Sequence, residues 1–326
     1  MTDLQTIQVL LSVIIVNYRT PQLVTECLET LLPEIDGIDA RIMLVDNLSG
    51  DDSPEIIRAW LANNDVGGKV TFIQSNRNGG YAAGNNMGIR ECSAKHYLLL
   101  NSDTLIRPGA IRIILDTAQK FPEAGIISPR IELPDGTGQE SCFRFRTPFS
   151  ELIDASQTYL VANLLSRYKP NLPIQTQIAR PQWTTFACVL VKEDVFRQIG
   201  LLDEGYFMYA EDMEFCHRVR EAGWDIVHNP DAKVAHTPAS SSTIKEVIQK
   251  KKRIPKYLFE SRARYYYQVY GWLGLTSANL LWWLGRLISK TRQLLGNSDK
   301  AANERQWLDI WTNWLNPLKP YTPQKK

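Results

Sequence analysis

The chain has 326 residues, of which 44% are hydrophobic and 22% are charged. These proportions exclude a disordered chain, a coiled coil and a collagen-like repeat, and a formal net charge of +2 indicates no partner. The charge is unevenly distributed, however. Residues 1–244 carry 21 basic and 30 acidic side chains, a net of −9, whereas residues 245–326 carry 16 basic and 5 acidic ones, a net of +11. A basic tail behind an acidic body predicts contact with something anionic.

Four apolar runs in the first hundred residues, each followed by polar residues, predict buried parallel strands. Helix-start residues lie after the first two runs, at Thr20-Pro21 and Ser53-Pro54, and a further helix is expected near Asn85–Glu91. This β-α-β-α-β-α-β order predicts an α/β fold with a doubly wound, mostly parallel sheet that binds ligands at the carboxyl ends of its strands. The four runs are Leu10–Tyr18, Ile42–Val45, Val70–Ile73 and Tyr97–Leu100.

The pattern weakens after residue 125. Ile126–Ser128 and Phe186–Val191 are expected strands, and Asp194–Ile199 is an expected helical turn. Residues 133–182 are rich in Pro, Gly, Ser and Thr and give no assignment. We therefore divide the chain into a sheet domain over residues 1–244 and a basic, Trp-rich helical extension over residues 245–326, which holds six of the nine tryptophans.

The extension opens with a basic segment, Lys245–Arg264, followed by Tyr265–Gly285, which has no charged residue but several polar ones. Polar residues make this a poor spanning helix. A basic segment beside a Trp-rich amphipathic stretch suits a helix at a membrane surface, so we expect peripheral membrane contact through residues 245–290. The alternative is a core helix packed on the sheet domain, and the pattern does not decide between them. The apolar face consists of Leu280, Trp283, Leu284, Leu287 and Ile288, and a final amphipathic helix is expected through Trp307, Trp311 and Trp314.

Several common kinds of site are absent from the sequence. No G-x-G-x-x-G follows the first strand, no P-loop occurs and no G-x-S-x-G elbow occurs, which disfavours dehydrogenases, P-loop NTPases and common hydrolases. The five cysteines form no C-x-x-C pair and are odd in number, so we expect no disulfide framework and a reducing, cytoplasmic compartment. The basic tail carries no nucleic-acid-binding motif, and we expect no nucleic acid partner.

Three polar clusters follow predicted strands. Asp46-Asn47 ends the second strand, where a carboxylate can accept hydrogen bonds from a nucleotide, although an ordinary turn has the same residues. Asn76–Ile89 is rich in Gly and Asn and opens a helix, a pattern that favours a diphosphate over a plain loop. Asn101-Ser102-Asp103 follows the fourth strand, where an exposed Asp can hold a divalent cation between phosphates; the alternative is a plain turn.

A fourth cluster of carboxylates, Glu211, Asp212 and Glu214, lies in a mainly apolar segment. Clustered carboxylates raise one another's pKa, which suits a general base. On a helix the cluster could instead be a solvated face paired with Arg218.

His236 follows about 24 residues later; neutral imidazole is a good Mn or Zn ligand, but a lone His is more often structural.

Together these segments resemble glycosyltransferase family 2, the inverting transferases with a GT-A fold. The resemblance covers roughly residues 10–240 and rests on motifs in the family's order. They are a first strand ending in V-N-Y at Tyr18, V-D-N-x-S at Asp46–Ser49, N-x-G-Y-A-x-G-N-N-x-G-I at Asn78–Ile89, N-S-D-T at Asn101–Thr104, and an acceptor-side "ED" segment within Asp203–Trp224.

The resemblance implies a nucleotide-diphosphate-sugar donor and a divalent cation, Mg or Mn. It implies that Asp212 is the general base, with Glu211 and Glu214 on the acceptor side, and that Asp103 and His236 hold the metal. The acceptor would be a hydroxyl of a glycan or a lipid-linked glycan, in cell-envelope polysaccharide synthesis at the inner face of the membrane. The donor would be bound by Asn17, Tyr18, Arg19, Asp46, Asn78, Gly79, Gly80, Asn101 and Ser102.

One residue departs from the pattern of many family members. Asn101 stands where they carry the first Asp of D-x-D, which removes a carboxylate from the metal. N-x-D forms resemble rhamnosyl- and galactofuranosyl-type transferases, which tilts the donor toward dTDP-rhamnose or another uracil- or thymine-nucleotide sugar. The alternative function is a catalytically degenerate module that binds a nucleotide sugar without turnover. A sugar-nucleotide-forming enzyme would need a Gly-rich, basic loop after the first strand, and Asn17–Pro21 supplies only Arg19.

Overall fold

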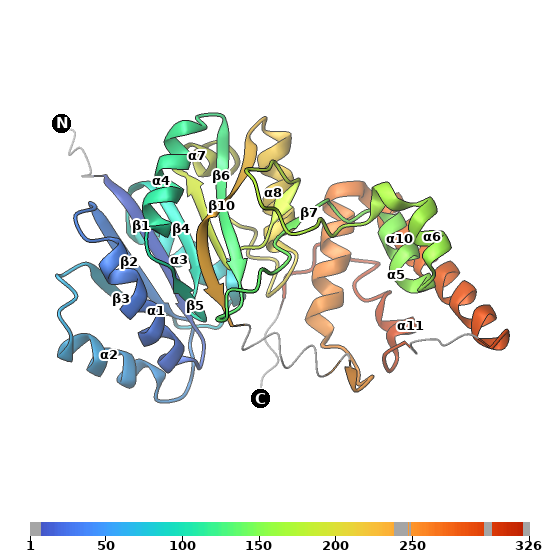
Figure 1. The fold of residues 1–326 in the computed structure, drawn as a ribbon. Coiled ribbons are helices and arrows are strands. Elements are labelled where there is room, and N and C mark those ends of the chain that lie inside the picture. Colours follow the sequence, from blue (N-terminus) through green and yellow to red (C-terminus); the bar gives the residue numbers. More distant parts are fainter. Residues whose placement is uncertain (1–7, 238–246, 248, 297–301, 322–326) are drawn as a thin grey trace, which may run out of the picture.

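The computed structural model describes residues 8–237, 247, 249–296 and 302–321. At its centre is an eight-stranded sheet with the order β3-β2-β1-β4-β9-β6-β10-β5 (Figure 1). The doubly wound, mostly parallel arrangement predicted from the sequence is confirmed. The strands are β1 Val9–Asn17, β2 Ala40–Asp46, β3 Val70–Gln74, β4 Ala94–Asn101, β5 Thr104–Ile106, β6 Ala124–Glu132, β9 Cys188–Lys192 and β10 Asp225–His236.

The register of the parallel strands brings their polar ends together. Asn17 at the end of β1 pairs with Asp46 at the end of β2, and Val16 pairs with Asn101 at the end of β4. Three antiparallel pairings lie outside what the sequence predicts. β9 runs antiparallel between β4 and β6, and β5 runs antiparallel to β10, which places His236 opposite Thr104.

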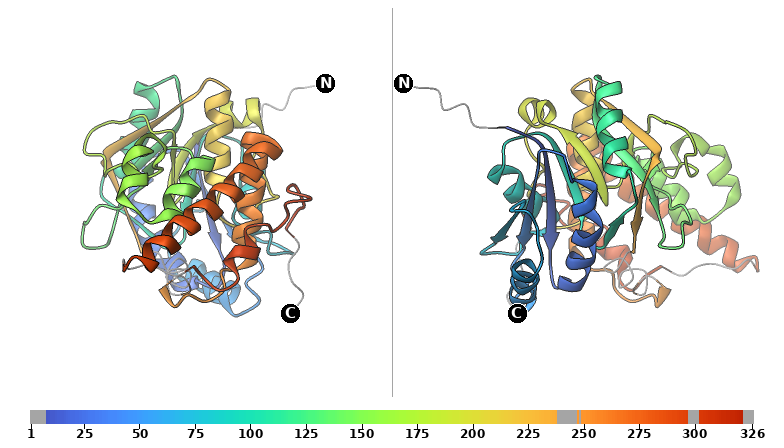
Figure 2. Two further views of the ribbon diagram at one scale, coloured as in Figure 1. Left: turned by 90° about the vertical axis from the view of Figure 1, so that its right-hand side faces the viewer. Right: turned by 60° about the vertical axis from the view of Figure 1, so that its left-hand side comes forward.

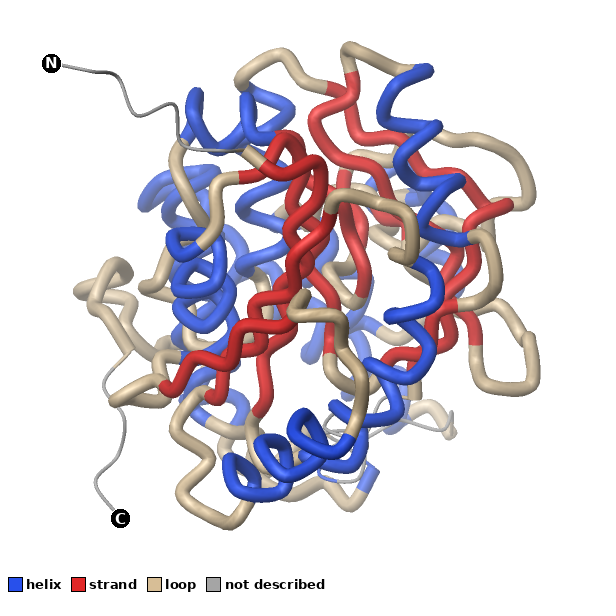
Figure 3. Tube along the Cα trace, turned by 90° about the vertical axis from the view of Figure 1, so that its left-hand side faces the viewer, coloured by secondary structure: helices blue, strands red, loops and turns tan. Residues whose placement is uncertain are grey.

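Helices cover both faces of the sheet, as Figure 3 shows. Alternate side chains of β1 point to opposite faces: Val13 and Ile15 pack in the core beneath α1, α2 and α4, whereas Ile14 packs in the core beneath α3, α7 and α8. The near-continuous apolar run of β1 is therefore explained by burial on both sides. The helices are α1 Pro21–Glu34, α2 Ser53–Asn63, α3 Gly80–Glu91, α4 Ala110–Lys120, α7 Glu193–Ile199 and α8 Glu211–Glu221.

Two helix predictions need correction. The helix α3 begins at Gly80, five residues before the expected Asn85, because the Asn78 side chain accepts a hydrogen bond from the Gly80 N–H and folds the Gly/Asn-rich segment into the helix start. The final amphipathic helix expected through the last three tryptophans is absent from the described residues 302–321. Only Gln306–Asp309 (α11) is helical there, and turns follow.

The segment without a sequence assignment, residues 133–182, forms a layer beyond the sheet. It contributes the short strand β7 (Cys142–Phe143), which pairs with β8 (Trp183–Thr184), and the helices α5 (Pro148–Ser156) and α6 (Tyr159–Leu164). A 3-10 turn, Ser166–Tyr168, follows α6. The helix α5 packs against the C-terminal helix, so this segment joins the sheet domain to the extension (Figures 1 and 2).

The C-terminal helix α10 spans Lys256–Leu294 and is interrupted at Gly271, whose φ of 66° is not helical. Its buried face includes Tyr265, Tyr266 and Trp282, while the face predicted from the sequence is exposed, with Leu280 at 57% and Leu287 at 62%. The helix thus packs as a core helix on one side and presents an apolar side outward.

The expected domain boundary at residues 244–245 lies outside the described residues. None of the helices in the described ranges has the length and apolar character that crossing a bilayer requires.

Candidate functional site

A cavity of about 450 Å³ opens at the carboxyl edge of β1, β2 and β4. Six of the predicted donor-binding and metal residues line it, together with the start of α3 and a loop ahead of α8. The sheet register and the early start of α3 therefore gather segments far apart in the sequence around one space. The predicted residues are Tyr18, Asn78, Gly80, Asn101, Ser102 and Asp103.

Asn17 and Asp46 lie just behind this cavity in a buried polar network. The Asn17 side-chain amide donates to Asp46 Oδ1 at 2.8 Å, and the Ser49 hydroxyl donates to the same oxygen at 2.5 Å. The Ser49 backbone N–H donates to the other oxygen, Oδ2, at 3.2 Å. Both carboxylate oxygens of Asp46 are thus bonded within the chain, and the side chain is fully buried. In this arrangement Asp46 positions the loop after β1, and its contact with a nucleotide stays a prediction.

The same network fixes Arg19 at the rim. Its backbone N–H donates to the Ser49 hydroxyl at 3.0 Å and its Nε donates to the Ser49 carbonyl at 2.8 Å. Arg19 adopts a φ of 61°, in the left-handed region that a non-glycine residue seldom occupies. The side chain of the expected N-cap Thr20 forms no capping hydrogen bond with its own helix. Its hydroxyl instead donates to Asn17 Oδ1 and lies 3.2 Å from the Ser102 hydroxyl, which ties the ends of β1 and β4 together.

The Gly/Asn-rich segment is held against β2 and against the loop before α8. The Asn47 amide donates to Asn78 Oδ1 at 3.1 Å and to the Gly80 carbonyl at 3.0 Å. The Phe207 carbonyl accepts the Tyr81 N–H at 2.9 Å. Gly79 is the N-cap of α3, and its N–H is 3.4 Å from the Asn47 side-chain oxygen. The glycines therefore let two backbones meet at the cavity wall.

Asp103 and His236 are brought together across β5 and β10. Asp103 Oδ1 lies 3.2 Å from His236 Nε2, and both side chains are largely buried. The pair is fixed by its backbones, since the Thr237 N–H donates to the Asp103 carbonyl and Gln139 donates to the His236 carbonyl. One carboxylate and one imidazole form a donor set that suits Mn²⁺. Within the described ranges no group of three or more His, Cys, Asp or Glu side chains converges, so further ligands would have to come from the substrate or water.

The first turn of α8 holds Glu211 and Asp212. Burial raises the pKa of Asp212 to about 6, while the Met213 N–H, which donates to Asp212 Oδ1 at 2.8 Å, favours the ionised form. Burial and the neighbouring Asp212 raise the pKa of Glu211 well above its usual range. Glu211 is 6% exposed, and its Oε2 has no hydrogen-bond partner among the described residues. The raised pKa values disfavour ionisation of both carboxyl groups at once, and Asp212 is the member that ionises near neutral pH.

The backbone that enters α8 is strained. Tyr209 and Ala210 both have a φ of 69°, two consecutive non-glycine residues in the left-handed region. Tyr209 lines the 450 Å³ cavity and also lines a second cavity of about 690 Å³, into which Ala210 and Met213 project as well. Asp212 follows two residues after Ala210, in the first turn of α8, and is not among the residues that line either cavity.

Glu214 has a different environment. Its carboxylate is buried and forms a two-pronged ion pair with Arg218, at 2.6 and 3.0 Å, and that guanidinium also donates to the carbonyls of Ile199 and Leu201. The helical pairing that was the alternative interpretation is therefore present, although the face is buried rather than solvated. The acceptor-side role of Glu214 stays a prediction, and these contacts give it a structural function.

Sequence reasoning missed three contributors to the site. Ser49 could have been found from its place in the V-D-N-x-S motif, but its hydrogen bonds to Asp46 and Arg19 depend on the fold. Phe207 contributes through its backbone carbonyl, for which a sequence holds no signal. Tyr209 borders both cavities, and only the left-handed backbone sets its direction.

Comparison with known proteins identifies the family. The model described as "Glycosyl transferase family 2" matches residues 12–162, and that described as "Glycosyl transferase family group 2" matches residues 96–298. The chain belongs to glycosyltransferase family 2. The second match alone covers more than half of the sequence and extends past the end of α10, so the whole C-terminal helix lies within the family's region of similarity.

Curated relatives of this family 2 chain include glycan-building enzymes. The chain is 34% identical over 222 residues to a hexosyltransferase of low-salt glycan biosynthesis from Haloferax volcanii, which covers 66% of this chain and 63% of the relative. It is 28% identical over 217 residues to the N-acetylglucosaminyl-diphospho-decaprenol L-rhamnosyltransferase of Mycobacterium tuberculosis, which covers 62% of this chain and 67% of that protein. The matches thus span about two thirds or less of the relatives' lengths.

Solved structures share the fold. GalNAc-T7, solved with UDP, GalNAc and Mn²⁺, has a TM-score of 0.52 at 14% identity over 79% of this chain and 50% of that one. A mannosyltransferase of Pyrobaculum calidifontis, solved with GDP-Man and Mn²⁺, has a TM-score of 0.51 at 14% identity over 96% of this chain and 86% of that one. The GT-A fold predicted from the motifs is confirmed.

Proposed function

We propose that this protein is an inverting glycosyltransferase that moves a sugar from a nucleotide-diphosphate sugar to a hydroxyl of a glycan or lipid-linked acceptor in cell-envelope polysaccharide synthesis. One observation carries the proposal: Asp103, which lies 3.2 Å from His236, lines the same cavity as the Gly/Asn-rich start of α3. The donor would occupy this 450 Å³ cavity, hereafter the donor cavity, with its diphosphate against Asp103 and the start of α3.

Asp212 is the proposed general base. Its pKa of about 6 leaves it ionised at neutral pH yet basic enough to take a proton from an attacking hydroxyl. The acceptor oxygen forms a bond to the anomeric carbon while the bond from that carbon to the diphosphate oxygen breaks on the opposite face. One displacement of this kind inverts the carbon and needs no nucleophilic residue. Protonated Glu211 lowers the charge beside Asp212 and keeps a second carboxylate from competing with it.

The pair of Asp103 and His236 would hold the divalent cation, with Mn²⁺ favoured over Mg²⁺ because one ligand is a ring nitrogen. A bound cation would supply neutralisation of the leaving diphosphate. The two structural neighbours that were solved with Mn²⁺ support this assignment. The remaining ligands would be phosphate oxygens and water, because no third His, Cys, Asp or Glu side chain joins the pair among the described residues.

The nucleotide pocket would be built by Tyr18 and Arg19 at the rim, with Asn17 and Asp46 holding the loop from behind. The N-x-D form at Asn101 favours dTDP-rhamnose or another UDP- or dTDP-sugar, and similarity to the mycobacterial rhamnosyltransferase supports that choice. The name of that relative includes a diphospho-decaprenol, which also supports a lipid-linked acceptor. We further propose a cytoplasmic location at the inner membrane face, with peripheral contact through residues 245–290, supported by the outward apolar side of α10.

Calorimetry tests the donor site directly. UDP, dTDP, GDP and CDP are titrated into the wild type and into Asp103→Ala, each with and without Mn²⁺. We expect binding of UDP or dTDP that requires Mn²⁺ and is weakened at least tenfold by Asp103→Ala, because the substitution removes the carboxylate proposed to bind the metal. Asp135→Ala, a change of the same kind in an exposed turn, is the matched control. Binding that is equal with and without metal would refute the metal-dependent site.

Nucleotide binding without turnover would favour the degenerate-module alternative. The deciding measurement is release of nucleotide diphosphate in the presence of an extract of lipid-linked acceptors, compared between the wild type and Asp212→Asn. Turnover that disappears in Asp212→Asn supports the transferase. Turnover that persists there would remove Asp212 as the base.

A further inference from the structure

The larger cavity, of about 690 Å³, lies between α5, α10 and the segment 302–310 on the far side of Tyr209. We call it the α10 cavity. The donor assignment does not use it, although Tyr209 borders both cavities. Its volume is in the range that holds small-molecule ligands. Its lining includes Arg146, Lys251, Ile254, Leu258, Phe259, Arg262 and Trp282.

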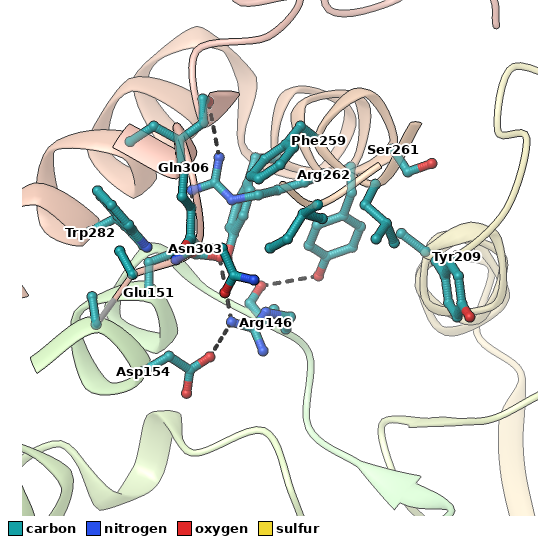
Figure 4. Close-up of a pocket in the computed structure, with 18 of the residues that line it drawn as sticks. Arg146, Glu151, Asp154, Tyr209, Phe259, Ser261, Arg262, Trp282, Asn303 and Gln306 are labelled. Carbon is teal, nitrogen blue, oxygen red and sulfur yellow. Dashed lines mark hydrogen bonds and ion pairs between the residues drawn. The ribbon is translucent and has the colours of Figure 1, made fainter. Parts of the chain in front are cut away.

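The α10 cavity has a polar middle and apolar walls. Figure 4 shows Tyr209 at one end and Trp282 at the other, with Arg146 and Arg262 between them. Ile254, Leu258 and Phe259 add further apolar wall. Going from the Tyr209 end of the cavity to the Trp282 end, a ligand would meet first the Tyr209 hydroxyl, then the two guanidinium groups and then Trp282.

Of the two guanidinium groups, Arg146 forms ion pairs with Glu151 and Asp154, whereas Arg262 is incompletely satisfied by the protein. The Glu151 carboxylate forms an ion pair with Arg262 at 3.3 Å. It also accepts hydrogen bonds from Arg146 at 3.4 Å and from the Tyr266 hydroxyl at 2.8 Å, so three groups share one carboxylate. The Nε atom of Arg262 is buried and donates no hydrogen bond to another described residue, and Nη2 has only the 3.3 Å ion pair with Glu151. Buried donors without acceptors are costly unless a ligand supplies oxygen atoms. Lys251 adds a further positive charge to the cavity wall.

We propose that the α10 cavity binds the acceptor, and that the acceptor is an amphiphile with an anionic phosphate-type group and an apolar chain. The inference rests on the proposed transferase function and adds the acceptor's site and chemical class. The hydroxyl to be glycosylated would reach Asp212 past Tyr209 and Met213. The phosphate oxygens would accept from Arg262 and Arg146, since guanidinium groups match phosphate geometry. The chain would lie along Leu258 and Trp282 and leave toward the outward apolar side of α10.

Three probes separate the two parts of the ligand: farnesyl diphosphate, uncharged farnesol and inorganic diphosphate. Each is titrated calorimetrically into the full chain without Mn²⁺. We expect farnesyl diphosphate to bind at least tenfold more tightly than either of the others, because only it reaches both the guanidinium groups and the apolar wall. An excess of UDP should leave this affinity unchanged. Equal affinity for farnesyl diphosphate and diphosphate, or its displacement by UDP, would overturn the proposal.

Two substitutions at half-buried wall positions locate the site, each with a matched control. Leu258→Trp fills the cavity, and Leu133→Trp adds the same bulk outside it. Lys251→Glu reverses a charge on the wall, and Lys252→Glu makes the same change one residue away, at an exposed position outside the lining. We expect the affinity for farnesyl diphosphate to fall about tenfold in both wall variants and to stay within twofold in both controls. Unchanged affinity in both wall variants would place the binding elsewhere and refute the inference.

Nucleotide titrations on the same preparations separate this proposal from the proposed function. If UDP or dTDP binds with Mn²⁺ and the wall variants still bind farnesyl diphosphate like the wild type, the acceptor inference fails and the transferase stands. If farnesyl diphosphate binding depends on Leu258 and Lys251 while no nucleotide binds, the α10 cavity stands as an amphiphile site and the transferase function fails. A wild type that binds no farnesyl diphosphate overturns the inference in either case.

Discussion

The carbonyl oxygen of Phe207 occupies the place where residue 80 would carry a Cβ atom. A Cβ built on Gly80 would lie 1.8 Å from that oxygen, and Gly80 has a φ of +83°. Because the same carbonyl accepts the Tyr81 N–H, the contact joins the start of α3 to the loop that leads into Asp212. One glycine thereby links the wall of the donor cavity to the proposed base.

We expect Gly80→Ala to lower the free energy of unfolding by about 2–4 kcal/mol, the sum of left-handed backbone strain and a backbone clash. Gly109→Ala is a matched control, because Gly109 has nearly the same φ, +81°, but nothing within 4 Å of its Cβ position. That control should lose only about 1–2 kcal/mol. Urea denaturation of both variants measures the difference, and equal losses would show that the Phe207 carbonyl can move away.

Asp212→Asn should abolish turnover while leaving nucleotide binding intact, because the amide cannot accept the acceptor's proton. In the wild type, kcat/KM should fall as the pH drops below about 6, where Asp212 becomes protonated. Glu214→Gln removes a nearby carboxylate that is already paired with Arg218, so it should alter stability more than the pH profile. A wild-type profile that stays flat from pH 5 to 8 would exclude an ionisation of this carboxylate from the rate.

Glu211→Gln should stabilise the protein at neutral pH. The folded-state pKa of Glu211 is raised, so the folded protein retains a proton that the unfolded chain releases. Its contribution to stability is full below the ordinary carboxyl range of about pH 4 and is lost as the pH rises through the folded-state pKa. We expect a gain of about 1–2 kcal/mol at pH 8 and little gain at pH 4. Thermal unfolding at both pH values checks this, and a loss of stability at pH 8 would contradict the assigned charge state.

Asn101→Asp should tighten Mn²⁺ binding about tenfold, because it adds a carboxylate two residues from Asp103 in the same cavity. Asn171→Asp makes the same change outside the cavity and serves as the control. Titration of Mn²⁺ in the presence of UDP or dTDP gives both affinities. If Asn101→Asp binds Mn²⁺ no more tightly than the wild type, the side chain at position 101 does not face the cation.

The parts of the fold that the sequence predicts are those set by local pattern. The apolar runs of β1, β2, β3 and β4 and the Pro at the start of α1 depend on neighbouring residues, and the structure confirms them. The carboxyl edge follows because parallel strands end on the same side. The insertion of β9 between β4 and β6 could not be predicted, since a short apolar run carries no information on its partner or direction.

For the candidate site too, the sequence predicts the individual residues but not the long-range contacts that bring them together. Asp103 and His236 were named separately, each with a structural alternative, and their 3.2 Å approach depends on the antiparallel pairing of β5 with β10. The α10 cavity was beyond sequence reasoning, because it forms where a segment without periodicity, around α5, packs on a helix more than a hundred residues later. Long-range packing of this kind leaves no local signature.

The outward side of α10 is apolar, and we expect it to contact a membrane surface. Leu273, Leu280 and Leu287 are 84%, 57% and 62% exposed, and on the neighbouring α6 Leu160 and Leu164 are 80% and 84% exposed. Packing of α10 on α5 places both apolar surfaces at the same end of the molecule (Figure 1). Together with the basic tail, this surface should bind anionic vesicles. The sequence had indicated the side on α10 but not its continuation on α6.

We expect the full chain to sediment with phosphatidylglycerol vesicles at low salt, to release partly at 0.5 M salt, and to bind phosphatidylcholine vesicles weakly, because salt screens the charge attraction and leaves only the apolar contact. The double variant Leu280→Glu/Leu287→Glu should lose most of this binding. Leu48→Glu, at a 44% exposed position beside the donor cavity, adds the same kind of charge elsewhere and should bind like the wild type. Equal binding by the double variant and the control would assign the attachment to the basic residues alone, and a wild type that stays in the supernatant at low salt would refute the membrane contact.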